Sequence, residues 1–315
     1  MKKTLLALLM AVMPFLATAQ TLKDAVDAYN EGAKLYSADK EGAITQFEKA
    51  LNICKAVGTE GDSTRMKIEG FLPGLYFDVA NTAYNAKKFY EAIEKGKRAE
   101  AVATRLNNDT YKDRSGKLLA NTYFLLGNNG IRSNQLDSAI HYYNLSLGIE
   151  PKSVVWFNLA QAYMRKGDEP KMAEAMNKTF ELAKTENNAD INDKATKICT
   201  QYYYKQAATQ MKNPAKSLEY IDKTLSYNPK FSEAYYLKSI VLFQQKKFQE
   251  SADAATQAIQ NETNPDNLGK IYFQLGFAYN SMKKTPDACA AFKKAAESKA
   301  YEAKAKENLK NLKCQ

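Results

Sequence analysis

Apolar and small residues recur at helical spacing through most of the chain. In residues 119–151, Tyr123 and Gly127 lie four positions apart on one helical face. After a short polar turn, Ala139 and Tyr143 lie on one face of a second helical segment. The pattern predicts two helices joined by a turn, and the same unit recurs six more times along the sequence.

The seven units follow one another at two different spacings. The first bulky position of each unit is occupied by Ala28, Tyr76, Tyr123, Trp156, Gln201, Tyr235 and Tyr272, which by subtraction gives steps of 48, 47, 33, 45, 34 and 37 residues. The three long steps contain the polar stretches 58–70, 105–116 and 187–193. We expect longer second helices or protruding loops there, and a change of curvature or flexing near Asn187.

The unit resembles the tetratricopeptide repeat: a bulky residue, a small residue four positions later and an Ala twelve positions after that, in about 34 residues. This resemblance implies an all-α fold, a right-handed α-solenoid of about seven helix pairs over residues 20–299, with a capping helix over residues 300–315. The small residue lets the paired helices approach closely, so each unit must stack on its neighbours to bury that face. Gly96 stands where a bulky residue is usual, and we expect a neighbouring helix to pack there.

The first 19 residues are typical of a secretory signal peptide. Lys2 and Lys3 precede an apolar run over residues 5–16, and the small residues end at Ala19. Twelve apolar residues would span only about 18 Å as a helix, against a hydrocarbon core of roughly 30 Å. We therefore expect cleavage after Ala19, a periplasmic or secreted protein, and no transmembrane segment after signal cleavage.

The basic charge of the chain does not predict a nucleic-acid site. The formal net charge is +10, and removal of Lys2 and Lys3 leaves +8. The remaining Lys residues are scattered through the repeats, and no run of five like charges occurs. A solvated basic surface explains this distribution, so we expect no nucleic-acid partner.

Four cysteines are too few for a disulfide scaffold in a chain of this length. Cys54 and Cys199 belong to different repeats and are expected to be buried, small apolar residues. Cys289 lies in the last repeat and Cys314 follows the closing helix. If those two helices are antiparallel, the two thiols come close together, so a disulfide between them is a hypothesis.

The sequence offers no recognisable catalytic or metal site. The chain has one histidine, His141, next to two tyrosines in a predicted helix, where a partly exposed structural role explains it better than base catalysis. No cysteine pair has metal-binding spacing, no glycine-rich loop follows a strand, and no serine stands in a nucleophile turn. We expect a non-enzymatic protein without a cofactor or a metal.

An aromatic residue stands three positions before the small position in every repeat, including the fifth, where Lys205 occupies that position. These residues are Tyr29, Phe77, Phe124, Phe157, Tyr202, Tyr236 and Phe273. The resemblance implies that this position, with those four and seven residues later, lines a concave groove. We call this set the aromatic stripe, and its predicted partner-binding members are Phe77, Asn81, Tyr84, Phe124, Asn128, Ile131, Phe157, Gln161, Met164, Tyr202, Gln206, Tyr236, Phe243, Phe273 and Phe277. The simpler explanation is that these rings pack beside adjacent helices.

Three functions are compatible with such a stripe. Aromatic rings and side-chain amides with few charges suit an extended peptide or a partner's helix, which predicts a protein-interaction module or assembly scaffold in the cell envelope. Alternatively, the chain is a structural component of an envelope complex that uses its convex face. A third hypothesis is a carbohydrate-binding solenoid, because aromatic rings stack on sugars.

Overall fold

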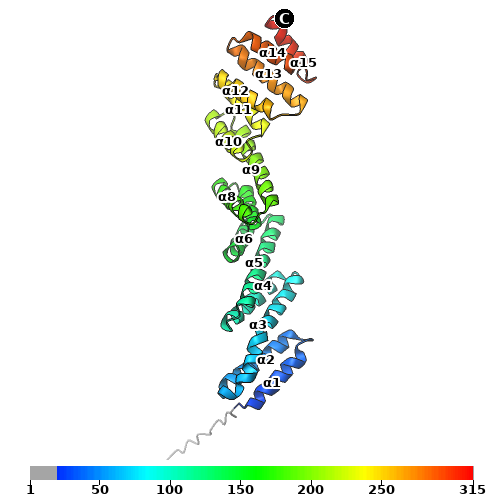
Figure 1. Cartoon of the computed structure of the whole chain (residues 1–315), viewed down its shortest axis with the longest axis vertical. Coiled ribbons are helices and arrows are strands. Elements are labelled where there is room, and N and C mark those ends of the chain that lie inside the picture. Colours follow the sequence, from blue (N-terminus) through cyan, green and yellow to red (C-terminus); the bar gives the residue numbers. More distant parts are fainter. Residues whose placement is uncertain (1–19, 315) are drawn as a thin grey trace, which may run out of the picture. The chain divides into compact units, whose positions relative to one another are not determined.

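The computed structural model describes residues 20–314, which form fifteen α-helices and one short 3₁₀ helix, with no strand within that range. Fourteen of the helices follow one another as seven pairs, and a fifteenth helix ends the array (Figure 1). The predicted all-α architecture of about seven helix pairs plus a closing helix is therefore confirmed. The predicted signal peptide, residues 1–19, lies outside the described residues.

The helices group into two compact units, the first ending at Ala173 and the second beginning at Glu174. The first unit contains α1 (Leu22–Leu35), α2 (Lys40–Val57), the 3₁₀ helix η1 (Gly58–Gly61), α3 (Asp62–Asn85), α4 (Phe89–Arg105), α5 (Asp109–Arg132), α6 (Leu136–Ile149) and α7 (Ser153–Lys166). Each helix from α1 to α6 packs on the next one in the chain, as expected for stacked repeats.

The second unit contains most of α8 (Glu169–Thr185) and all later helices. These are α9 (Ala189–Thr209), α10 (Pro214–Tyr227), α11 (Ser232–Gln244), α12 (Phe248–Gln260), α13 (Pro265–Ser281), α14 (Thr285–Ala295) and α15 (Glu302–Asn311). From α9 to α15 each helix again packs on its successor. Within each unit, over α1–α7 and over α9–α15, consecutive helices therefore pack on one another.

The three polar stretches that separate distant repeats do not form protruding loops. They are largely helical, because the first helix of the following pair begins early: α3 and α5 have 24 residues each and α9 has 21. The side chain of Asn108 caps α5 by accepting a hydrogen bond from the Tyr111 amide (3.1 Å). The extra helical turns carry buried apolar residues such as Ile68. Burial of these side chains offsets the conformational entropy that the segments lose when they become helical.

One turn conformation joins the two helices of most pairs. A single residue with positive φ follows the first helix, and the next amide donates back to a carbonyl five residues earlier, as in a Schellman motif. The positive-φ residues are Lys87, Asn134, Gly167, Lys246 and Lys283. Repetition of this turn gives the pairs a common geometry despite their different sequences.

In the first, third and seventh pairs, a glycine on the first helix makes room for a ring on the second helix. A Cβ atom added at Gly32 would lie 2.9 Å from the ring of Phe47, and one at Gly276 would lie 2.6 Å from Phe292. In the sixth pair, Ser239 and Ser251 fill the same place and their hydroxyls lie 3.1 Å apart. This close approach is the reason that the pattern requires a small residue.

Gly96 on α4 leaves space in which the next helix packs, as the sequence predicts. A Cβ atom at this position would lie 3.0 Å from the Leu119 side chain and 3.3 Å from Leu118, both on α5. Leu119 is 2 % exposed. The missing side chain of Gly96 therefore lets the long helix α5 pack closely against α4.

Candidate functional site

The residues of the aromatic stripe occupy the first helix of each pair, and all of them are at least half-buried. Phe77 on α3 and Phe157 on α7 are each only 7 % exposed and belong to the hydrophobic core. The remaining stripe residues named above are of intermediate burial. Phe77 and Phe157 therefore have too little free surface for a ligand, and the partly exposed members are the candidates for binding.

In the first unit, the stripe rings contact side chains of their own repeat and of the next one. Phe124 lies 6.1 Å from the ring of Tyr143. The guanidinium of Arg114 lies 4.3 Å from the centre of the Phe77 ring and 5.0 Å from that of Tyr111. This cation–π contact holds an exposed Arg over the buried Phe77 ring.

In the second unit, the closing segment covers the end of the stripe. Phe273 lies 5.4 Å from the ring of Tyr301, just before α15, and 4.8 Å from Phe277. Both phenylalanines also contact Phe292, which is fully buried. The Lys270 ammonium lies 5.0 Å from the Tyr236 ring. Packing within the last repeat and against the closing segment thus accounts for the end of the stripe.

A chain of side-chain amides crosses α5, α6 and α7. The Tyr143 hydroxyl donates to Oδ1 of Asn128 (2.8 Å), and Nδ2 of Asn158 donates to the same oxygen (3.0 Å). Nε2 of Gln161 in turn donates to Oδ1 of Asn158 (3.3 Å). We call Asn128, Asn158 and Gln161 the amide relay. Burial raises the pKa of Tyr143 to about 12, so its hydroxyl stays protonated and keeps donating at neutral pH.

The amide relay brings together two residues that the sequence predicts and one that it missed. Asn128 and Gln161 belong to the predicted stripe, whereas Asn158 follows Phe157 and stands at none of the positions that define the stripe. The sequence does contain a signal for Asn158, because Asn158 and Gln161 are three residues apart and therefore lie on the same face of a helix. The contact with Asn128, 30 residues earlier, depends on the packing of α7 against α5.

Two arginines lie beside the amide relay. The Arg165 guanidinium donates to the backbone carbonyl of Ile131, a predicted stripe residue, at 3.3 Å. Arg165 and Arg132 are both exposed and both lower the pKa of Tyr143, against the larger effect of burial. Neither forms an ion pair within residues 20–314. The edge of the relay is therefore positively charged.

Several predicted stripe residues make few contacts with the rest of the site. The ring of Tyr84 lies 6.5 Å from Phe89, and Phe243 lies 5.3 Å from Phe248 at the start of α12. No side-chain hydrogen bond of Asn81, Met164 or Gln206 occurs among the described residues. These positions are partly buried and are not organised into a second polar cluster.

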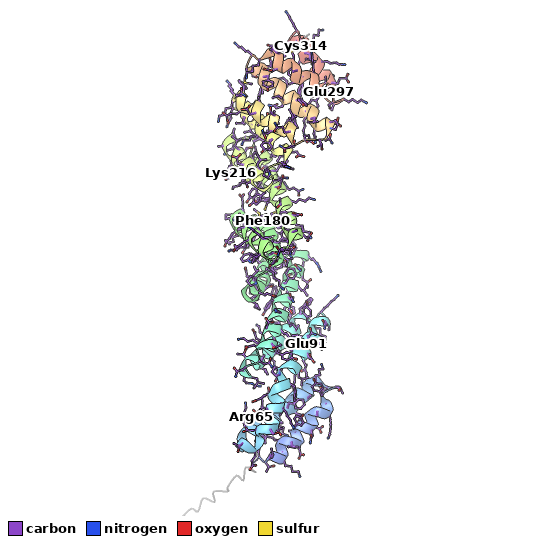
Figure 2. All side chains as sticks on the ribbon, in the orientation of Figure 1. Arg65, Glu91, Phe180, Lys216, Glu297 and Cys314 are labelled. Atoms are coloured by element: carbon purple, nitrogen blue, oxygen red, sulfur yellow. A yellow bond between two sulfur atoms is a disulfide. The ribbon has the colours of Figure 1, made fainter. Side chains whose placement is uncertain are left out.

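The two C-terminal cysteines lie in contact. A disulfide joins Cys289 on α14 to Cys314, which follows α15, with their Cα atoms 5.7 Å apart (Figure 2). Cys54 and Cys199 are free and buried. Burial raises the pKa of Cys199 to about 12, with a smaller opposing contribution from a hydrogen bond with Tyr227. These two free thiols are therefore poorly reactive core residues.

Residues 20–314 contain neither a cluster of metal-binding side chains nor a helix suited to cross a membrane. Over residues 20–314, no group of three or more His, Cys, Asp and Glu side chains is placed to hold a metal ion. Among those same residues, no helix combines the length and apolar character needed to cross a membrane.

His141 is exposed on α6, with its ring 5.3 Å from that of Tyr142.

Comparison with solved structures finds similar folds at low sequence identity. A crystal structure of MamA is 20 % identical, with a TM-score of 0.36, over 59 % of this chain and 94 % of that chain. YrrB, titled a TPR protein with an unusual peptide-binding site, is 15 % identical over 60 % of this chain and 91 % of that chain (TM-score 0.34). The TPR2AB domain of yeast Sti1 in a complex with pHSP90 is 17 % identical over 91 % of this chain and 96 % of that chain (TM-score 0.33).

A family model matches two segments of the chain, whereas no curated sequence matches it. No curated protein sequence matches the chain significantly. The tetratricopeptide repeat model matches residues 120–153, which span most of α5 and all of α6, and residues 269–302, which span most of α13 and all of α14. The first match contains the Gly127–Tyr143 contact and the second contains the Gly276–Phe292 contact. These two matched segments are therefore tetratricopeptide repeats, and the other helix pairs of the described residues follow the same helix–turn–helix pattern.

Proposed function

We propose that this chain is a protein-interaction module that binds an extended peptide segment of a partner across α5, α6 and α7. The observation that carries the proposal is the amide relay, which places three side-chain amides and the Tyr143 hydroxyl in one hydrogen-bonded row. All of these side chains except that of Tyr143 are partly exposed. The row is held in position by the protein, so a ligand meets an ordered polar surface.

An extended peptide has the groups that this row can bind. Its backbone presents N–H and C=O groups that need hydrogen-bond partners when they leave water. Nδ2 of Asn128 and Oε1 of Gln161 have no hydrogen-bond partner among the described residues, so they offer one donor and one acceptor. The partly exposed ring of Phe124 offers an apolar surface beside them.

The charge around the relay favours a ligand with acidic groups. Arg132 and Arg165 are exposed and form no ion pair within the part of the chain that is described. Acidic residues flanking the bound segment would complement these two guanidinium groups and speed the encounter with the partner. Binding should therefore weaken as ionic strength rises.

Selection of peptides from a random library on residues 20–315 tests the proposal. The selected peptides are then titrated calorimetrically against the unmodified protein, Asn158→Ala and the control Asn144→Ala, an exposed residue of α6. We expect about tenfold weaker binding for Asn158→Ala, corresponding to about 1.4 kcal/mol, and no change for the control. Equal affinities for all three proteins, with unchanged helix content, would place the site elsewhere.

Export is part of the same proposal. The basic start, apolar run and small residues before Gln20 support cleavage after Ala19 and a periplasmic or secreted location in the cell envelope. N-terminal sequencing of the protein recovered from cells that produce the full chain tests this. We expect the mature protein to begin at Gln20, whereas recovery of chains that still begin at Met1 would contradict export by this route.

A further inference from the structure

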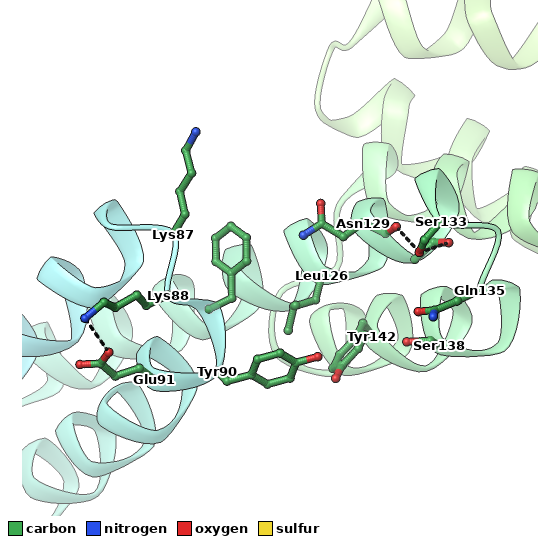
Figure 3. A pocket seen from close by; sticks show the side chains of 12 residues that line it. Lys87, Lys88, Tyr90, Glu91, Leu126, Asn129, Ser133, Gln135, Ser138 and Tyr142 are labelled. Carbon is green, nitrogen blue, oxygen red and sulfur yellow. Dashed lines mark hydrogen bonds and ion pairs between the residues drawn. The ribbon is translucent and has the colours of Figure 1, made fainter.

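A cavity of about 440 Å³ opens between the second helices of two consecutive repeats in the first unit. Its walls come from the start of α4, including Phe89 and Tyr90, and from the start of α6, including Tyr142. Leu126 on α5 points into the middle of the cavity between these walls (Figure 3). A volume of this size lies within the range of small-molecule sites in proteins.

This cavity is separate from the amide relay. On α5 its lining residues are Leu126, Asn129 and Gly130, whereas the stripe uses Phe124, Asn128 and Ile131 on the same helix. Residues two positions apart point about 200° away from each other around an α-helix. The cavity and the stripe therefore lie on opposite sides of α5, and a substitution in one leaves the contacts of the other in place.

The polar side chains of the cavity are not used by the protein itself. Asn129, Gln135 and Ser138 line the cavity, and their side chains make no hydrogen bond within residues 20–314. The Ser133 hydroxyl donates to the Asn129 backbone carbonyl (2.8 Å), which leaves its lone pairs able to accept. Two amides and two hydroxyls thus present both donors and acceptors to whatever enters.

The charged groups at the cavity are neutralised or directed away from it. The Lys88 ammonium lies 3.4 Å from the Glu91 carboxylate, which also pairs with Lys95. A hydrogen bond from Lys95 lowers the pKa of Glu91, so this carboxylate stays ionised and paired. Figure 3 shows the Lys87 side chain extending away from the other lining residues. Lys87 is therefore the one lining charge without an ion pair among the described residues.

Two tyrosines supply aromatic surface. Tyr90 is 70 % exposed, the highest exposure among the large hydrophobic residues of the described chain. Tyr142 is held in place, since its ring stacks on Tyr123 at 6.3 Å and 18°. A hydrogen bond with the Tyr90 hydroxyl raises the pKa of Tyr142, and Figure 3 shows the two side chains directed toward each other. Tyr90 therefore offers a largely exposed ring whose side chain is directed toward Tyr142.

We propose that this cavity binds a neutral saccharide, with a pyranose ring stacked on Tyr90 and its hydroxyls bonded to Asn129, Gln135 and Ser138. The C–H groups of a pyranose are weakly positive and suit the negative face of an aromatic ring. Each sugar hydroxyl both donates and accepts, as do the amide and hydroxyl side chains here. Anionic ligands would find one cation unpaired within residues 20–314, Lys87, whose side chain extends away from the other lining residues, and aliphatic ligands would leave the polar atoms of the cavity unpaired.

Titration with neutral pentasaccharides of glucose, mannose and N-acetylglucosamine tests this proposal on residues 20–315. Isothermal calorimetry is run on the unmodified protein and on Tyr90→Ala, Tyr36→Ala and Asn158→Ala. Tyr36 is the matched control, because it is also an exposed tyrosine (41 %) of the first unit but lies outside the cavity. Both tyrosines are exposed, so removal of either ring should leave the fold intact.

We expect at least one pentasaccharide to bind, a loss of at least tenfold in affinity for Tyr90→Ala, and unchanged affinity for Tyr36→Ala and Asn158→Ala. Absence of binding for all three sugars at millimolar concentration overturns the proposal, as does unchanged binding to Tyr90→Ala. If instead a library-selected peptide loses affinity in Tyr90→Ala, the cavity is a protein-binding surface. The amide relay is tested by Asn158→Ala alone, so the two proposals can fail independently.

Discussion

Tyr143 on α6 occupies the space that a side chain at Gly127 on α5 would need. A Cβ atom added at Gly127 would overlap the Tyr143 ring, and the hydroxyl of the same tyrosine donates to Asn128, the next residue on α5. Tyr143 is 1 % exposed. One residue therefore fills the centre of the helix pair and holds one end of the amide relay.

The Gly127→Ala substitution should destabilise the first unit. The added methyl group forces the Tyr143 ring to move in a close-packed interior, which costs about 1–3 kcal/mol and outweighs the gain in helix propensity. Urea unfolding followed by Trp156 fluorescence measures the effect. The control is Gly70→Ala in α3, where a Cβ atom would meet nothing within 4 Å, and which should be neutral or stabilising by about 0.5–1 kcal/mol. Similar losses in both variants would contradict this account.

The Phe157→Ser substitution should lower the urea midpoint of unfolding relative to the unmodified protein. Phe124→Ser should lower this midpoint by less. Phe157 is 7 % exposed, and removing a buried phenylalanine ring costs about 3–5 kcal/mol. Phe124 is only partly buried, although its ring contacts Tyr143. Urea midpoints from circular dichroism distinguish the two. Equal midpoints would show that the two stripe positions are equivalent.

Reduction of the Cys289–Cys314 disulfide should loosen α15. Ala305 is the only fully buried residue of that helix, so packing alone holds it weakly. The disulfide spans 25 residues, and the chain-entropy model gives such a cross-link roughly 3 kcal/mol. Amide hydrogen exchange should speed up over residues 302–311 after treatment with dithiothreitol, and little over α13.

The cysteine count offers a direct check of that prediction. Denatured, unreduced protein should show two reactive thiols, from Cys54 and Cys199, and four after reduction. Cys314→Ser should reproduce the faster exchange of α15 without a reductant. If exchange is slow in the reduced protein, the contact between Tyr301 and Phe273 is sufficient to hold the closing segment.

Stability should fall at alkaline pH, starting below the range in which ordinary tyrosines ionise. Burial raises the pKa of Cys199 from 9.0, and that of Tyr227 from 10.0, each to about 12. The folded state then keeps protons that the unfolded chain loses, so this stabilisation is complete below about pH 9 and is lost as pH rises toward 12. Urea midpoints between pH 8 and 10.5 should decline less steeply in Cys199→Ala. An unchanged slope would assign the decline to other groups.

The sequence by itself determined the helix pairs and their interlocking. Every pair depends on residues within about 20 positions of each other: a small residue on one helix, such as Gly127 or Gly276, and a ring or small residue on the next. These contacts repeat at regular spacing, so periodicity is enough to predict them. The repeat pattern also predicted that a neighbouring helix would pack at Gly96, and Leu119 of α5 lies there.

Only the tertiary structure decided which stripe residues could contact a ligand and how polar groups combine. Phe77 and Phe124 hold the same repeat position, yet the first is buried and the second is partly exposed, because burial depends on the neighbouring repeat. Asn158 reaches Asn128 across 30 residues through helix packing. The cavity beside Tyr90 likewise joins residues of three helices. Sequence periodicity sets which face of a helix is buried, whereas the distances between repeats set which exposed side chains meet.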